Sequence, residues 1–172
     1  MVTGMYEREI RGVLSGDEEM LASLTKTCTE DEISDYYSIL DIPFMVVRAG
    51  GSLGIDIIAI RGELSFPIEV KSSKKPVVYF SDEERLTEQA EEMISMCTAS
   101  SVLPLYAFRL KGERGDKWRI FTLEINGLKK KQKLLQRRIP LIQTTMHGNY
   151  KMDWRKGMPL HNFIAYIRHL II

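Results

Sequence analysis

Two apolar segments joined by two residues constrain this chain most. Residues 55–60 are rich in β-branched side chains, and residues 64–71 form a second apolar run with polar ends. Gly62 and Glu63 lie between the runs. A two-residue connection that begins with Gly fits a type II′ turn between paired strands. The segment therefore predicts a β-hairpin.

The register of this hairpin predicts which side chains meet. If Arg61 faces Leu64, counting outward along both strands places Asp56 opposite Glu69. Directly opposed residues have Cβ atoms roughly 4.5–5.5 Å apart on one face of the sheet. Lys71 is two residues beyond Glu69, so it shares that face. Two carboxylates and one ammonium group are expected together, provided that the strands contain no bulge.

Such a cluster at an apolar hairpin needs a compensating partner. Close like charges repel, and charges removed from water are costly. A divalent cation relieves both effects, and carboxylate oxygens suit Mg²⁺ or Mn²⁺. A nearby lysine can stabilise developing phosphate charge or position an attacking water. The alternative is a salt-bridged surface hairpin, and the apolar flanks favour the metal site over it.

Composition fits one globular domain. The chain has 172 residues, with 44% hydrophobic and 27% charged residues, which suits a full core. No apolar run reaches the length of a membrane span, and the first residues do not resemble a signal peptide. Cys28 and Cys97 form neither a disulfide framework nor a metal-ligand cluster. We therefore expect reduced cysteines and a cytoplasmic protein without a membrane segment.

The net charge of +1 hides a strong asymmetry between the two parts of the chain. Residues 1–100 hold 9 Lys/Arg and 19 Asp/Glu, a balance of −10. Residues 101–172 hold 15 Lys/Arg and 4 Asp/Glu, a balance of +11. This pattern indicates an acidic or metal-binding part and a polyanion-binding part, or an electrostatic seam within one subunit or between two.

The remaining periodicity predicts an α/β protein, with a central mixed β-sheet flanked by helices. Ser81, with Glu84 three residues later, predicts a capping box at the start of the helix that follows. The expected helices cover residues 5–14, 30–40, 81–97 and 160–172. The expected strands, beside those of the hairpin, cover residues 44–48 (as a buried strand), 77–80, 102–110, 118–123, 140–145 and 150–154.

Three short blocks resemble the archaeal Holliday-junction resolvases, within the PD-(D/E)XK nuclease superfamily. They are Val46–Ser52, Asp56–Ala59 and Ile68–Ser72, and they match the core of that family in residue type and spacing. The resemblance implies a restriction-endonuclease-like fold for a single nuclease domain over residues 1–172. It further implies a structure-selective endonuclease that uses Mg²⁺ (or Mn²⁺) and acts as a homodimer on branched double-stranded DNA. No small-molecule cofactor is expected.

Two alternatives remain open. The first is another DNA repair or restriction-like nuclease of the same superfamily. The second is a non-catalytic DNA-binding protein with the same fold, which the intact set of two acids and a lysine disfavours. Cleavage of branched DNA separates the first alternative from a resolvase, and substitution of Asp56 tests the second.

The resemblance also implies residue roles. Asp56 and Glu69 match metal ligands, the carbonyl of Val70 matches a further ligand, and Lys71 matches the catalytic lysine. Gln89 is similar to a polar residue of the superfamily, or is simply an exposed helix glutamine. The candidate DNA contacts are Arg8, Arg48, Ser52, Ser72, Lys74, Lys75 and Gln89.

The acid expected on the first helix has two candidates. Glu7 lies in a Glu-Arg-Glu sequence like that of the family, and the accompanying Arg8 favours it. The distance from Glu7 to Arg48 is longer than in the family, whereas Glu32 lies near the family spacing. Either residues 15–43 contain an insertion, or Glu32 supplies the acid.

The last part of the chain, residues 125–172, is expected to form a strand pair and a helix. Lys129–Arg138 is a basic segment that either contacts phosphates or is a solvated loop. The apolar residues of the final helix form either a dimer interface or ordinary core; they are Phe163, Ile164, Ile167 and Ile171.

Overall fold

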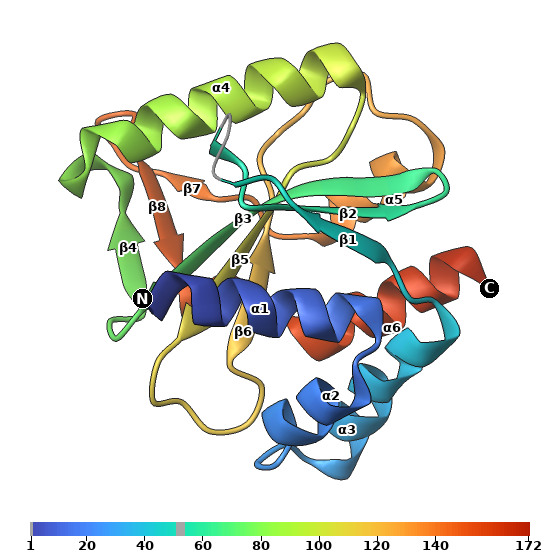
Figure 1. The fold of residues 1–172 in the computed structure, drawn as a ribbon. Coiled ribbons are helices and arrows are strands. Elements are labelled where there is room, and N and C mark those ends of the chain that lie inside the picture. The colour runs from blue at the N-terminus through green and yellow to red at the C-terminus, as the bar shows by residue number, and fades with distance from the viewer. Residues whose placement is uncertain (1, 51–53) are drawn as a thin grey trace.

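A computed structural model describes residues 2–50 and 54–172, together with their side chains except those of residues 2, 3 and 84. Its largest element is a six-stranded sheet in the order β1-β2-β3-β5-β6-β9 (Figure 1). The strands are β1 (Met45–Arg48), β2 (Ile57–Arg61), β3 (Leu64–Ser73), β5 (Leu105–Leu110), β6 (Trp118–Phe121) and β9 (Met158–Pro159). β3 and β5 pair in parallel and their neighbours pair antiparallel, so the sheet is mixed as predicted.

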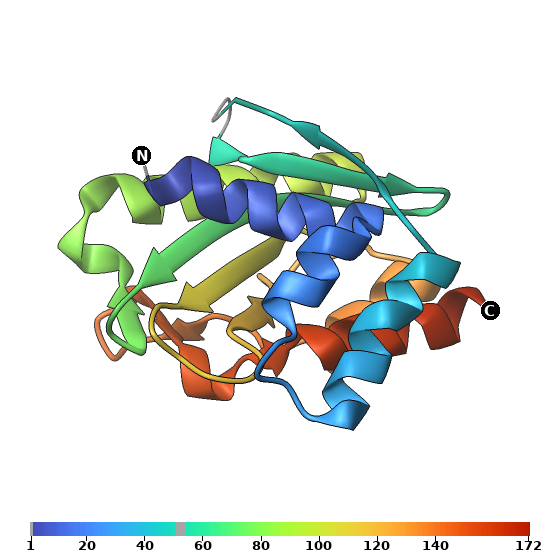
Figure 2. The ribbon, with the colours of Figure 1, turned by 60° about the horizontal axis from the view of Figure 1, so that its bottom comes forward.

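Helices cover both faces of this sheet (Figures 1 and 2). α1 (Val2–Ser15) and α6 (Leu160–Ile171) lie on one face, and α4 (Glu84–Ser100) lies on the other. α4 forms most of the crossover between the parallel strands β3 and β5, which a short turn could not connect. Its buried stripe is the predicted one: Leu86, Ala90, Met93 and Cys97.

The predicted hairpin is confirmed. Arg61 pairs with Leu64 and Ile57 pairs with Ile68, so the register matches that expected from the sequence. Gly62 has a φ of +53°, which glycine adopts without the strain that a Cβ atom causes. Asp56 lies one residue before the ladder begins, at the open end of the hairpin.

The segment between α1 and β1 is helical. It contains α2 (Glu18–Leu24), α3 (Glu30–Tyr37) and the 3₁₀ turn η1 (Ser38–Asp41), and α3 packs against α6. The Arg168 Nε donates to Asp41 at 2.8 Å, which adds a polar contact between α6 and η1. The proposal that residues 15–43 contain an insertion stays a prediction.

Two local predictions are wrong. The segment at 44–48 is not a buried strand, because β1 is the edge of the sheet and leaves Met45 and Val47 exposed. Ser81 does not cap α4, because it lies in the 3₁₀ turn η3 (Phe80–Asp82) and the helix begins at Glu84 without a side-chain cap.

The C-terminal part contains the expected strand pair and helix. β7 (Gln143–Thr144) pairs with β8 (Tyr150–Asp153), and β8 also pairs with β4 (Val77–Tyr79) in a small second sheet. The 3₁₀ turn η4 (Trp154–Lys156) leads to β9, and the basic segment forms helix α5 (Lys130–Arg138).

The final helix belongs to the core of this chain. Its residues Phe163, Ile164 and Ile167 are fully buried, and Ile171 is partly buried against the same core. The apolar surface of Phe163, Ile164 and Ile167 is therefore not available as a dimer interface. None of the described helices is long and apolar enough to cross a membrane.

Candidate active site

Asp56 is held firmly at the mouth of the hairpin. Its Oδ2 accepts a hydrogen bond from the backbone N–H of Val70 at 2.7 Å. Its own backbone N–H donates to the carbonyl of Ile68 at 3.1 Å, and its carbonyl accepts from the N–H of Ala49 at 2.9 Å. These contacts tie Asp56 to both neighbouring strands, so its carboxylate has a fixed position beside β3.

Glu69 and Lys71 share one face of β3, as predicted. The Lys71 Nζ lies 2.8 Å from the Glu69 Oε1, and the Glu69 side chain is only 10% exposed. Burial raises the pKa of Glu69 to about 7, Lys71 opposes that rise, and the negative charge of Asp56 adds to it. A buried carboxylate with both a cation and a second carboxylate beside it is typical of a functional site.

Glu7 joins this group from α1. Burial raises its pKa, and the charge of Asp56 raises it further, while Arg48 lowers it. The Arg48 Nη2 lies 3.5 Å from the Glu7 Oε2. The charge of Asp56 thus raises the pKa of both Glu7 and Glu69. The fold therefore brings together three carboxylates, one from α1, one from just before β2 and one from β3.

A second glutamate on α1 explains how Glu7 reaches the site. Glu9 accepts hydrogen bonds from the Arg109 Nε at 2.8 Å and from the Trp118 Nε1 at 2.7 Å. The Arg109 guanidinium also lies 4.4 Å from the centre of the Tyr6 ring. These contacts anchor α1 to β5 and β6. The sequence alone does not predict these contacts, because the partners of Glu9 lie 100 and 109 residues further along the chain.

Glu32 lies in a different environment. Its side chain accepts from the backbone N–H of Thr29 in a capping box at the start of α3, and this bond lowers its pKa. Its Oε2 is 3.8 Å from the Nε2 of His161 on α6. The structure therefore places Glu7, and not Glu32, beside Asp56.

The candidate DNA contacts come from α1, from the end of β1 and from the end of β3. Arg48 is 59% exposed beside Glu7, and Arg8, Lys74 and Lys75 are exposed. Ser72 is partly buried on β3, next to Lys71.

Gln89 lies against the loop that leads to Asp56. A Cβ atom at Gly54 would come within 3.2 Å of the Gln89 Cγ, so the two positions are in close contact. Ser52 falls outside the described residues.

The donor atoms fit an oxygen-seeking divalent ion by their chemistry. Their arrangement is not that of a ready-made cage, because no three Asp, Glu, His or Cys side chains among residues 2–50 and 54–172 are grouped closely enough to hold an ion. Glu69 is bonded to Lys71 and Glu7 is paired with Arg48. An ion would therefore compete with these two cations for the carboxylates.

The comparison with protein families matches this geometry. The model of the archaeal Holliday junction resolvase family matches residues 36–172. The chain belongs to this family. It is accordingly a Holliday junction resolvase, a nuclease of DNA recombination and repair. The mixed sheet with helices on both faces agrees with the restriction-endonuclease-like fold expected for the family.

Among solved structures, the chain is similar to the Hjc protein of Archaeoglobus fulgidus, a Holliday junction resolvase from an archaeal hyperthermophile. The identity is 21%, the match covers 72% of this chain and 88% of that chain, and the TM-score is 0.47. No curated protein matches the chain significantly. The family match begins at residue 36, so Glu7 and Glu32 both lie outside it. The choice between them comes from the geometry alone.

Proposed function

We propose that this resolvase hydrolyses phosphodiester bonds at four-way DNA junctions with the help of Mg²⁺ or Mn²⁺. Glu7, Asp56 and Glu69 would hold the ion, with the carbonyl of Val70 as a further ligand. The observation that carries the proposal is the gathering of both glutamates around Asp56, with the Lys71 Nζ 2.8 Å from Glu69.

When bound, a divalent ion activates water for attack and stabilises charge on the leaving oxygen. The chain's own contribution is to fix the carboxylates beforehand. Asp56 is already oriented by the N–H of Val70, and Glu7 is held in reach by the anchored helix α1. The burial of Glu69 keeps water away and strengthens its attraction to a cation.

We propose two roles for Lys71. In the free protein its ammonium group offsets the charge of Glu69. With DNA present, the same group would face the phosphate that is cut and stabilise the charge that develops on it, or orient the attacking water. A positioned charge of this kind contributes a few kcal/mol to transition-state stabilisation, roughly 3 kcal/mol in comparable sites.

Binding to the junction would use four exposed cations, of which Arg48 lies beside Glu7. Arg8, Arg48, Lys74 and Lys75 would contact phosphates, and Ser52, Ser72 and Gln89 would add polar contacts. Phosphate contacts position the protein without reading sequence, which suits a substrate defined by its branching.

A homodimer completes the proposal. A four-way junction has two-fold symmetry, and paired cuts need two sites at a fixed separation, which a C2 dimer provides. The interface must use residues other than Phe163, Ile164 and Ile167, because these are buried within one chain.

The experiment is cleavage of a synthetic four-way junction with and without Mg²⁺, beside linear duplex, flap and single-stranded DNA. Lys71→Ala is the control. Paired symmetric nicks on the junction alone, lost in the control, are expected. Equal cutting of the other substrates would show a superfamily nuclease without junction selectivity. Binding without cutting, in every metal tried, would show a non-catalytic protein.

A further inference from the structure

Helix α5 carries a dense set of positive charges. No acidic residue occurs between Ile125 and Met152. We define the α5 basic surface as the six cations Lys129, Lys130, Lys131, Lys133, Arg137 and Arg138. Five of them are exposed and Lys131 is partly buried.

Most of the contacts that hold α5 in place come from its uncharged side chains. Leu135 is fully buried beneath the helix. The Gln132 Oε1 accepts from the backbone N–H of Leu103 at 2.8 Å, and its Nε2 donates to the carbonyl of Ser101 at 3.2 Å. Gln136 donates to the carbonyl of Leu123 at 3.3 Å. One leucine and two glutamines therefore anchor the helix. Of its cations, Lys131 pairs with Glu63 and Arg138 lies 5.2 Å from the centre of the Tyr166 ring. Lys129, Lys130, Lys133 and Arg137 are exposed.

The charges also weaken the helix that carries them. Lys129 and Lys133, and then Lys133 and Arg137, are four residues apart and repel each other across successive turns. Lys130 and Lys131 lie at the positive end of the helix dipole, where acidic residues would be favourable. A polyanion would relieve this repulsion, and among the described residues the only acidic partner of these six cations is Glu63, which pairs with Lys131.

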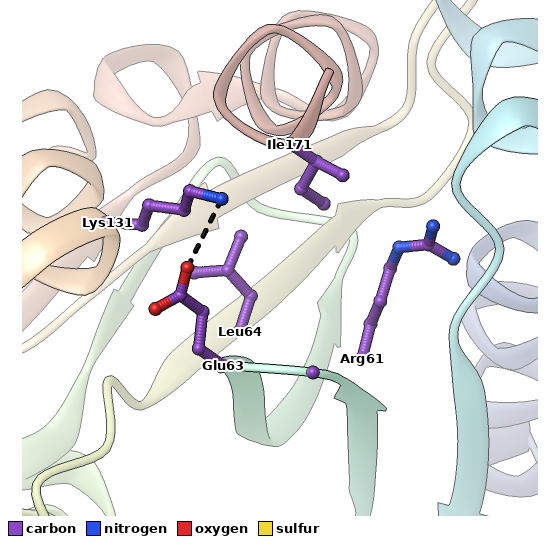
Figure 3. A pocket seen from close by; sticks show the side chains of 6 residues that line it. Arg61, Glu63, Leu64, Lys131 and Ile171 are labelled. Carbon is purple, nitrogen blue, oxygen red and sulfur yellow. Dashed lines mark ion pairs between the residues drawn. The ribbon is translucent and has the colours of Figure 1, made fainter.

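One ion pair connects the surface to the hairpin. The Lys131 Nζ lies 3.2 Å from the Glu63 Oε1, as Figure 3 shows. Beside it is a pocket of about 430 Å³ lined by Arg61, Gly62, Glu63, Leu64, Lys131 and Ile171. A second pocket of about 200 Å³ also borders Glu63 and Lys131 and extends to Lys129 and Lys130. Cations therefore border both hollows, and the smaller one is lined by three lysines of the α5 basic surface.

This surface is remote from the candidate active site. α5 lies beside the turn of the hairpin, where β3 begins at Leu64. Glu69 is five residues further along β3, so the turn and Glu69 are roughly 17 Å apart along the strand. One strand of B-form DNA advances about 3.4 Å per base pair, so this distance corresponds to about five base pairs. A phosphate bound at α5 is therefore not the phosphate that is cut.

We propose that the α5 basic surface binds the phosphate backbone of a duplex arm, about five base pairs from the cleaved bond. The contact does not depend on base sequence, and it extends the length of duplex that the protein binds on one arm of the junction. The inference rests on the proposed function, since it takes branched DNA as the ligand. A competing occupant is a second copy of the chain, because residues 1–100 have a net charge of −10 and residues 101–172 a net charge of +11. The acidic residues of one copy would then bind the α5 basic surface of the other.

The test compares two triple variants with the same change in charge. The test variant is Lys129→Gln, Lys133→Gln and Arg137→Gln, three exposed cations along one side of α5. The control is Lys26→Gln, Arg114→Gln and Lys156→Gln, three exposed cations on other elements: they lie between α2 and α3, between β5 and β6, and in η4. Binding to a four-way junction is measured without divalent metal, over a range of salt concentrations, and single-turnover cleavage is measured with saturating enzyme and Mg²⁺.

The test variant is expected to bind roughly tenfold more weakly and to reduce the slope of log affinity against log salt by up to about 3, while its saturated cleavage rate stays unchanged. The control variant should keep most of the wild-type affinity and most of the wild-type salt slope. Equal salt slopes for the two variants would overturn the inference. A changed oligomeric state with an unchanged salt slope would assign the surface to a second copy and overturn it too. Because binding is measured without cleavage, the result holds even if no DNA is cut.

Discussion

Two buried carboxylates in this molecule have opposite surroundings. Asp116 accepts hydrogen bonds from the hydroxyl of Tyr36, from the N–H of Trp118 at 3.1 Å and from the N–H of His161 at 2.9 Å. Glu69 has one bonded cation, Lys71, and a second carboxylate nearby. Burial raises the pKa of both acids, but only Asp116 has its raised pKa opposed by three hydrogen bonds.

The difference separates structure from function. Asp116 joins α3, β6 and α6, and its bonding capacity is satisfied within the chain. Buried polar groups of that kind stabilise a fold. Glu69 instead lies near a second carboxylate, Asp56, whose charge is unfavourable to it. The fold alone does not require this pair, and such a pair is typical of residues that bind a ligand.

The largest expected effect is on catalysis. Glu69→Gln keeps the shape of the side chain but removes a charged ligand, so single-turnover cleavage of a four-way junction should fall at least about a thousandfold. Junction binding without metal should remain near the wild-type value. Cleavage within tenfold of wild type would make Glu69 a structural acid like Asp116.

Asp116→Ala should instead reduce stability. The change leaves the hydroxyl of Tyr36 and two backbone N–H groups buried without their acceptor, which should cost about 3 kcal/mol in the free energy of unfolding. Urea denaturation measures this loss. The remaining folded protein should cut at the normal rate, and a specific loss of cleavage at full stability would contradict the comparison.

The sequence predicted the local half of this picture. The hairpin and its register follow from two β-branched or apolar runs and a Gly at the turn, which are local properties. The edge position of β1 could not be predicted, because it depends on the order of strands in the whole sheet. Asp116 was likewise overlooked, since its partners come from residues 36, 118 and 161.

The stability of the metal-free protein should depend on pH through Glu69. Its pKa in the folded protein is about 7, above the ordinary 4.5, so the folded state holds this proton more tightly than the unfolded chain. This stabilisation is complete below pH 4.5 and is lost as the pH rises through 7, by roughly 3 kcal/mol at most.

Thermal or urea unfolding in a chelator between pH 5 and 8 measures this dependence. Asp116 also has a raised pKa and contributes a decline of the same sign. The relevant quantity is therefore the difference between wild type and Glu69→Gln, which should have a flatter profile. Identical profiles would show that Glu69 does not carry the shift.

The smallest effect distinguishes the two N-terminal acids. Glu32→Ala removes half of the capping box at α3 and should cost about 1 kcal/mol of stability without changing cleavage. Glu7→Ala should leave stability nearly unchanged and reduce cleavage strongly. If instead Glu32→Ala reduced cleavage strongly and Glu7→Ala did not, the metal-binding role would belong to Glu32 on α3.

The most direct measurement is cleavage of a four-way junction by wild type and by Asp56→Asn, with Mg²⁺ and with a chelator. Asp56 is the carboxylate whose charge raises the pKa of both Glu7 and Glu69. We expect paired nicks from wild type that require Mg²⁺, and a loss of at least about a thousandfold in the variant with binding retained. Cutting by Asp56→Asn at the wild-type rate would contradict the assignment of this site.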